Sequence, residues 1–312
     1  MDGIINVYKE AGYTSHDVVA VLRKILHMKK IGHTGTLDPD AVGVLPVCVG
    51  KGTKLCSLLT DHDKEYEAEV LLGVTTDTLD TSGRVLSQSP VSCDKDGLIA
   101  VLSEFRGEIT QTPPMYSAVK VNGKKLYEYA REGIEVERKQ RKVHIYELEL
   151  TGESIEEDKC FSIRVRCSKG TYIRTLIDDI GRRLGCGAVM RHLTRTKVGS
   201  FGIEDALTLD EISRACESVQ AEEGFESVPD IILPVDRVFA GMRRAYVTED
   251  GMKRLKNGNP LTYDDFIFKG ESTKDSDTGS AADRLRVYGA DGEFYAVYKK
   301  SGNRYMVEKF FH

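Results

Sequence analysis

The sequence predicts an α+β protein with two structural units. Over most of the 312 residues, segments with the alternation of β-strands are interspersed with segments of helical periodicity. Near the C-terminus, three strand-like runs and one short helix predict a second, β-rich unit. We therefore expect a large α+β domain over residues 1–238 and a small β-rich domain over residues 239–312.

The N-terminal region predicts a strand followed by a helix. Residues 3–8 are an apolar run of strand composition. Thr14 and Asp17 have the spacing of a capping box, which predicts a helix from about Val18 to Met28.

The next stretch, residues 32–46, reads Gly-His-Thr-Gly-Thr-Leu-Asp-Pro-Asp-Ala-Val-Gly-Val-Leu-Pro. Its glycines and prolines exclude a long helix and predict a shaped loop. The apolar run from Val42 to Val49 then predicts a strand or packed turn that enters the core. Asp38 therefore lies at the mouth of a hydrophobic element. From these residues alone it is either a turn residue or a functional carboxylate.

A strand over residues 63–73 carries Tyr66, which on its pattern alone is a packing residue. Residues 75–83 predict a polar loop with two carboxylates, Asp77 and Asp80. Two carboxylates also suggest a metal site or an acid–base pair, but with no third ligand nearby, loop capping is the better interpretation.

The remaining expected elements follow in chain order. They are helices over 51–59 and 96–105, an extended segment over 111–120, a helix over 124–132, strands over 143–150 and 161–168, a turn into a helix over 169–181, a basic loop over 185–200, a helix over 209–219 and one over 249–256, a flexible insertion over 270–283, and strands over 285–288, 294–298 and 305–310.

Composition excludes several classes of protein. Hydrophobic residues at 40% and charged residues at 30% are ordinary for a globular protein. There is no signal-peptide pattern at the N-terminus and no apolar run of the roughly 18 residues that span a membrane, so we expect a cytoplasmic protein. The seven cysteines are scattered without a C-x-x-C pair, which predicts reduced thiols.

The distribution of charge points to a polyanionic partner although the net charge is −5. Residues 119–145 contain eight Lys and Arg against four Glu, and residues 164–197 contain nine against two Asp. By contrast, residues 198–236 contain one Arg against ten acidic residues. If the basic segments share a face, they form a phosphate-binding surface; otherwise they are solvated surface charges.

Gly-His-Thr-Gly-Thr-Leu-Asp-Pro, followed by Gly43 and Leu45-Pro46, resembles the active-site motif of the bacterial tRNA pseudouridine-55 synthases, the TruB family. Asp63-Lys64-Glu65-Tyr66, Thr76-Asp77-Thr78 and the segment from Lys124 to Val136 resemble further family segments. Lys9 to Ser15 is similar to Lys-Pro-x-Gly-x-Ser, although Glu10 replaces the usual Pro. The resemblance covers residues 3–208, and residues 240–312 loosely resemble a PUA RNA-binding domain.

The resemblance implies a mainly antiparallel sheet and the isomerisation of uridine 55 in the T-loop of tRNA, without cofactor or metal. It implies that Asp38 is the nucleophile and that Arg174, on its pattern a surface helix charge, pairs with it. It also implies that Tyr66 contacts the uracil and that Tyr172 borders the uracil pocket.

Four more residues are assigned to substrate binding through the same resemblance. His33 fills the space of the flipped base, and Leu193 lies against that base. Arg195 is a phosphate contact or a neighbour of the active site, and Lys9 supports the substrate contacts from behind.

The implied partner is the T-arm of tRNA, and we expect a monomer with no obligate protein partner. Two alternatives stay open. One is a tRNA-binding or tRNA-folding module whose catalysis is secondary. The other is metal-assisted phosphoryl chemistry through Asp38, Asp77 and Asp80.

Overall fold

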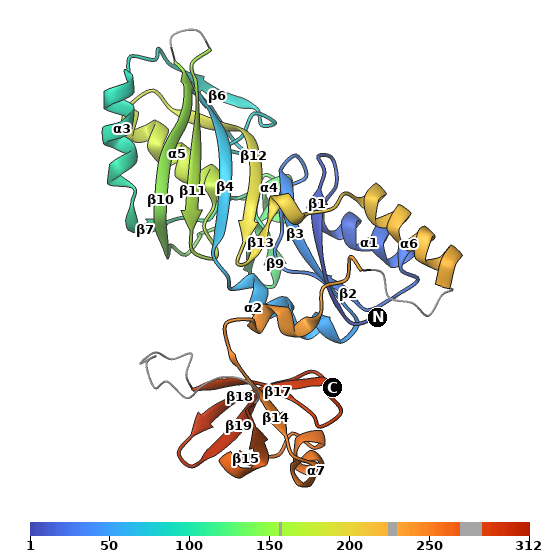
Figure 1. Ribbon diagram of the computed structural model, residues 1–312. Coiled ribbons are helices and arrows are strands. Elements are labelled where there is room, and N and C mark those ends of the chain that lie inside the picture. The colour runs from blue at the N-terminus through green and yellow to red at the C-terminus, as the bar shows by residue number, and fades with distance from the viewer. Residues whose placement is uncertain (156–157, 224–229, 269–282) are drawn as a thin grey trace.

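The computed structural model describes residues 1–155, 158–223, 230–268 and 283–312. Within these ranges the chain forms a nine-stranded sheet, a six-stranded sheet and two short hairpins. The large sheet and its helices lie at one end of the molecule, and the small sheet packs below α2 at the other end (Figure 1).

The large sheet has the order β1-β3-β12-β4-β11-β10-β7, with β2 paired to β3 and β13 to β12. Every pair is antiparallel except β3 with β12. The sheet is thus mixed and mainly antiparallel, as the resemblance implied. The strands are β1 (Gly3–Lys9), β2 (Ile31–His33), β3 (Val42–Val49), β4 (Lys64–Leu72), β7 (Gly107–Gln111), β10 (Arg141–Ser154), β11 (Cys160–Cys167), β12 (Ala188–Val198) and β13 (Phe201–Gly202).

Helices build two hydrophobic cores on this sheet. α3 and α5 cover the half that contains β4, β10 and β11, whereas α1 and α6 cover the half that contains β1 (Figure 1). No helix in the described ranges has the length and apolar character needed to span a membrane. The helices of this domain are α1 (Ser15–Ile25), η1 (Gly50–Leu55), α2 (Cys56–Thr60), α3 (Lys95–Glu104), α4 (Leu126–Arg131), α5 (Ile173–Leu184), η2 (Ile203–Asp205) and α6 (Leu209–Glu223).

Local capping explains where the first helix begins. Thr14 accepts from the backbone N–H of Asp17, and the Asp17 carboxylate accepts from the N–H of Thr14 at 2.9 Å. The predicted capping box is therefore confirmed, and α1 begins at Ser15, three residues earlier than expected. It also ends earlier, at Ile25.

Two small hairpins lie beside the sheet. β5 (Val74–Thr76) pairs with β6 (Val85–Gln88), so the predicted polar loop is the connection of a hairpin. β8 (Lys120–Val121) pairs with β9 (Lys124–Lys125), and β9 leads directly into α4. The helix predicted over residues 124–132 therefore begins two residues later than expected.

The prediction of a basic loop over residues 185–200 was wrong. This segment is β12, a central strand between β3 and β4. Its register against β4 shifts between Met190 and His192 and again between Arg195 and Lys197. Each bulge interrupts the two-residue alternation, which is the signal that identifies a strand in a sequence.

The C-terminal sheet has the order β15-β19-β18-β17-β14-β16. The strands predicted near β17, β18 and β19 are confirmed, whereas β14, β15 and β16 were not predicted. The insertion expected over 270–283 lies outside the described residues except for residue 283. The elements are η3 (Val235–Phe239), β14 (Arg243–Val247), η4 (Glu249–Gly251), α7 (Met252–Lys256), β15 (Leu261–Thr262), η5 (Tyr263–Asp265), β16 (Phe266–Ile267), β17 (Arg284–Tyr288), β18 (Phe294–Ser301) and β19 (Arg304–Phe310).

The two sheets share a hydrophobic cluster. Leu55 and Leu59 of the first domain belong to the same cluster as Val297 and Phe311 of the second. Lys54 also donates from Nζ to the carbonyl of Phe310 at 3.1 Å. The C-terminal domain is therefore packed against η1 and α2.

Candidate active site

A cavity of about 740 Å³ opens where the loop after β2 meets the β5–β6 connection, the segment before β8, and α4. Its lining combines apolar side chains with polar, acidic and basic ones. The apolar residues that line it include Leu37, Ala41, Met190 and Leu193; the polar and charged ones include Asp38, Asp80, Ser117, Lys125, Arg131, Arg174 and Arg191.

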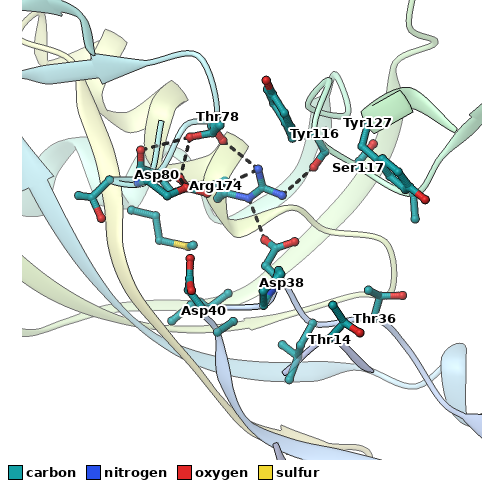
Figure 2. A pocket seen from close by; sticks show the side chains of 18 of the residues that line it. Thr14, Thr36, Asp38, Asp40, Thr78, Asp80, Tyr116, Ser117, Tyr127 and Arg174 are labelled. Carbon is teal, nitrogen blue, oxygen red and sulfur yellow. Dashed lines mark hydrogen bonds and ion pairs between the residues drawn. The ribbon is translucent and has the colours of Figure 1, made fainter. Parts of the chain in front are cut away.

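Asp38 and Arg174 form an ion pair inside the cavity. The Nε of Arg174 lies 2.9 Å from Oδ2 of Asp38, and Figure 2 shows the two side chains pointing toward each other. The Arg174 side chain is 6% exposed, whereas that of Asp38 is 39% exposed. The carboxylate therefore faces the cavity, and the guanidinium lies behind it.

Fixed acceptors hold the other donors of Arg174. Nη1 donates to the carbonyl of Thr78 and Nη2 to that of Tyr116, both at 2.8 Å (Figure 2). A second carboxylate, Asp80, lies 3.8 Å from Nη1. Only a guanidinium presents donors in this fixed fork, so Lys cannot replace Arg174 without losing part of the arrangement.

Burial and charge act in opposite directions on Asp38. Burial raises the pKa of the Asp38 carboxyl above its ordinary value, and the Arg174 guanidinium offsets part of that rise. Asp80 adds a smaller contribution that also raises the pKa. The ion pair thus keeps a carboxylate charged in a site that would otherwise favour its protonation.

Backbone contacts fix the loop that carries Asp38. The N–H of Leu37 donates to Oγ of Ser15 at 3.0 Å, and the N–H of Ala41 donates to the carbonyl of Asp38 at 3.1 Å. The proline that follows Asp38 disfavours helical backbone at that residue. These restraints present the carboxylate in one direction.

Lys9 lies behind this loop and has no exposed surface. Its Nζ donates to the carbonyls of Glu10, Tyr13 and Pro39 at 3.0, 2.7 and 2.8 Å. Burial lowers the pKa of Lys9 to about 8. Lys9 therefore ties the end of β1 to the loop that carries Asp38 and does not reach the cavity.

Arg195 is also behind the loop, and its residue is only 1% exposed. Its Nε donates to the carbonyl of Val44 at 2.7 Å, and its Nη2 donates to the carbonyl of Gly35 at 3.4 Å. Of the two roles expected for Arg195, a phosphate contact does not fit a side chain this buried. Arg195 instead supports the active-site loop from below.

Tyr66 is buried beneath the cavity floor. Its ring belongs to the same hydrophobic cluster as Leu37 and Leu193, and the Arg195 guanidinium is close enough to act on its pKa. Burial raises the pKa of Tyr66. The phenol is therefore a neutral ring at ordinary pH, and it does not line the cavity in this conformation.

The other expected site residues divide in the same way. Leu193 lines the cavity from β12. Tyr172 caps the start of α5 outside the cavity lining, where its N–H donates to Oε1 of Gln111 at 3.0 Å and Arg141 lies 5.3 Å from its ring. His33 ends β2 beside His16, and it is His16 that lines the cavity.

Comparisons with known proteins identify the family of this chain. Residues 23–173 match the model of the TruB family pseudouridylate synthase N-terminal domain. Residues 174–240 match the tRNA pseudouridylate synthase B C-terminal domain. The chain belongs to the TruB family.

Curated relatives of this TruB family member extend over the whole chain. It is 43% identical to the tRNA pseudouridine synthase B of Streptococcus pneumoniae and 46% identical to that of Lachnoclostridium phytofermentans, with 100% of both chains covered in each case. Both relatives are named as pseudouridine synthases, and pseudouridine synthases are isomerases.

Solved structures share the fold. A Cbf5-Nop10-Gar1 complex gives a TM-score of 0.72 at 30% identity, with 99% of this chain and 85% of that chain covered. An H/ACA RNP bound to a substrate RNA containing 2'-deoxyuridine gives 0.70 at 27% identity, with the same coverage. Both support the α+β assignment and the PUA-like C-terminal domain.

Several cavity residues of this TruB family member were missed from sequence. The segment Pro113–Ala118 was expected only to be extended, yet it contributes Tyr116 and Ser117 to the cavity. α4 contributes Tyr127 and Arg131. The basic and aromatic composition of residues 124–131 was the available signal, but nothing in the pattern shows that this segment folds back over the loop.

The hypothesis of a metal site at Asp38, Asp77 and Asp80 does not fit the geometry. The guanidinium of Arg174 lies between Asp38 and Asp80, where a shared cation would have to be (Figure 2). Asp80 Oδ1 accepts from Thr78 and Ser82, which confirms its expected role in loop capping. Among the residues that the structure describes, no group of three His, Cys, Asp or Glu could hold a metal.

Proposed function

We propose that this protein converts uridine to pseudouridine at position 55 in the T-loop of tRNA, with Asp38 as the nucleophile. The observation that carries the proposal is the ion pair of Asp38 with the buried Arg174 at the wall of a nucleotide-sized cavity, in a chain of the TruB family. A protein that only binds RNA gains nothing from a carboxylate facing a phosphate-rich ligand.

The reaction is an isomerisation without net oxidation or reduction. The bond from uracil nitrogen 1 to ribose carbon 1' breaks, the base rotates, and carbon 5 joins carbon 1'. Carbon 5 loses its proton and nitrogen 1 gains one. Attack by Asp38 on ribose carbon 1' and attack on uracil carbon 6 are both compatible with this outcome, and both require the ionised carboxylate.

The chain's own residues would bind the detached base and keep Asp38 charged. Arg174 stabilises the carboxylate, and the apolar side chains of Leu37, Met190 and Leu193 provide a surface for the uracil. Tyr66 packs in the same buried cluster as these side chains, so a shift of that cluster would bring its ring to the base. A buried phenol of raised pKa is a poor base, which favours a packing role for Tyr66 over proton abstraction.

The T-arm is folded, so the target uridine must be flipped out of its stack before it enters the cavity. We assign His33 to fill the vacated space and Tyr172 to the outer border of the pocket, beyond the residues that line the cavity. Lys125, Arg131 and Arg191 at the cavity would attract the RNA backbone. We assign residues 1–238 to catalysis and 239–312 to RNA binding, in a monomer that needs no protein partner.

A tRNA-binding or tRNA-folding activity can coexist with this chemistry, because the basic surface would serve both. Tritium release from uracil-5-labelled tRNA separates them. We expect the protein to release tritium in the presence of a chelator from an unmodified transcript, and to release none from a matched transcript with cytidine at position 55. Undiminished release from the second transcript would refute position 55 as the target. If neither transcript released tritium although the protein bound tRNA tightly, the proposed enzymatic activity would be refuted.

A further inference from the structure

Two imidazole rings meet beside the cavity. The ring centroids of His16 and His33 lie 5.1 Å apart with an interplanar angle of 72°, which is an edge-to-face arrangement. His16 is exposed and lines the cavity, whereas His33 is half-buried and lies behind it. The His16 ring therefore limits how the His33 ring can turn.

The two rings are attached to a rigid support. His16 is in the first turn of α1, and His33 is the last residue of β2. Helix and strand pack through Val19, Leu22 and Ile31, which belong to one buried cluster. Since the backbone of each residue is fixed by this core, the distance between the rings changes only by rotation of the side chains.

A further contact orients His33. The N–H of Gly35 donates to its Nδ1 at 3.3 Å, so Nδ1 is an acceptor and the ring proton is on Nε2. Burial, with smaller contributions from His16 and Arg195, lowers the pKa of His33. A neutral ring held in this way is suited to stacking among bases rather than to attracting phosphate.

We propose that His16 is a positioning residue for His33: its ring packs against the His33 ring and keeps it aligned for insertion into the RNA stack when the target base leaves. This inference rests on the proposed function, in which His33 replaces the flipped base. It concerns the ring of His16 and not its charge. The capping pair Thr14 and Asp17 flanks His16 at the start of α1, and these two residues are already hydrogen-bonded to each other.

The first test compares substitutions at His16 by tritium release from labelled tRNA. His16→Ala should lower kcat/KM by roughly 2- to 10-fold, the range for an aromatic pair contact. His16→Phe keeps a ring edge at the same position and should restore kcat/KM to about the wild-type value. The matched control is His27→Asn, two residues beyond the end of α1, where φ is +50° and Asn is tolerated. It should have no effect.

A double-mutant cycle tests the coupling of the two rings. If His16 acts through His33, the double variant His16→Ala/His33→Ala should be no slower than His33→Ala alone. The acid limb of the pH–rate profile, which reports Asp38, should be the same in His16→Ala and in the wild type. Unfolding midpoints of all variants would show that the fold is kept.

Three results would overturn the inference. Equal losses in His16→Ala and His16→Phe would assign His16 to a hydrogen bond or charge contact with RNA phosphate. If the losses of kcat/KM in the two single variants multiply in the double variant, the two histidines act independently. No loss in His16→Ala would show that the contact is unused. If wild-type protein itself releases no tritium, the proposed function fails first, so the two failures are distinguishable.

Discussion

Arg174 donates from Nε to Oδ2 of Asp38 at 2.9 Å, and burial nevertheless raises the pKa of that carboxyl. The ion pair therefore opposes desolvation without cancelling it. When ionised, an aspartate that is partly shielded from water is a better nucleophile than one in bulk water. The guanidinium is itself fixed by the carbonyls of Thr78 and Tyr116, so the arrangement exists before substrate binds.

Removal of the guanidinium should move the pH dependence of the reaction. In the wild type, activity falls as pH decreases through the raised pKa of Asp38, because the protonated carboxyl is not a nucleophile. In Arg174→Gln the contribution that lowers this pKa is lost. The acid limb should move to higher pH, and kcat at neutral pH should fall by about 10²-fold.

The matched control for Arg174→Gln is Arg182→Gln on the same helix, whose side chain is 70% exposed and pairs with Asp178 away from the cavity. It should leave the pH–rate profile of tritium release unchanged. An unshifted acid limb in Arg174→Gln would show that Asp38 is not the titrating group.

Lys9 should make the stability of the protein depend on pH in the alkaline range. Its pKa is about 8 when folded, against 10.5 ordinarily. Between these values the unfolded chain holds a proton that the folded chain has lost, so the free energy of unfolding rises with pH across this window. In Lys9→Met that rise is missing.

The difference between wild type and Lys9→Met should grow by up to about 3 kcal/mol from pH 8 to 10.5 and should be constant below pH 8. Urea unfolding over a pH series measures it. Lys24→Met, at an exposed position of α1, serves as the control, and the same slope in both variants would refute the assignment.

Gly43 should be required for the parallel pairing of β3 with β12. It has a φ of +105°, and a Cβ there would lie 2.3 Å from the carbonyl oxygen of Arg195, its partner in the register. Gly43→Ala should therefore destabilise the fold by roughly 2–4 kcal/mol, from backbone strain and overpacking together.

Gly185→Ala is the control for Gly43→Ala, because Gly185 has a φ of +79° with open space around its Cβ position. It should cost only about 1 kcal/mol, from backbone strain alone. Thermal or urea unfolding measures both variants. Equal losses of stability in the two variants would show that the close approach of β3 and β12 does not require glycine at position 43.

Local sequence patterns predicted those elements whose signal is itself local. The capping box of α1 and the alternation of β11 depend on a few neighbouring residues, and both were predicted correctly. β12 was missed because two bulges break its alternation. β14 was missed because it has only five residues and begins with two arginines, so its apolar alternation is too short to mark a strand.

Within the site, the residue pattern identified the loop of Asp38 as unusual, and the family resemblance connected it to Arg174, 136 positions further on. Neither the residue pattern nor the resemblance could predict which of the site residues are buried. Arg195 belongs to a basic segment and Lys9 follows a predicted strand, and only the fold shows that both hold the loop from behind. His16 carries no signal in the sequence, because its role depends on the packing of α1 against β2.

The most direct test of the account is Asp38→Asn, measured for both tritium release and tRNA binding. The amide keeps the size of the side chain but is not a nucleophile, so we expect no tritium release while the Kd for tRNA stays within about 3-fold of the wild-type value. Residual release near the wild-type rate from Asp38→Asn would contradict the assignment of Asp38 as the nucleophile, and with it the central claim.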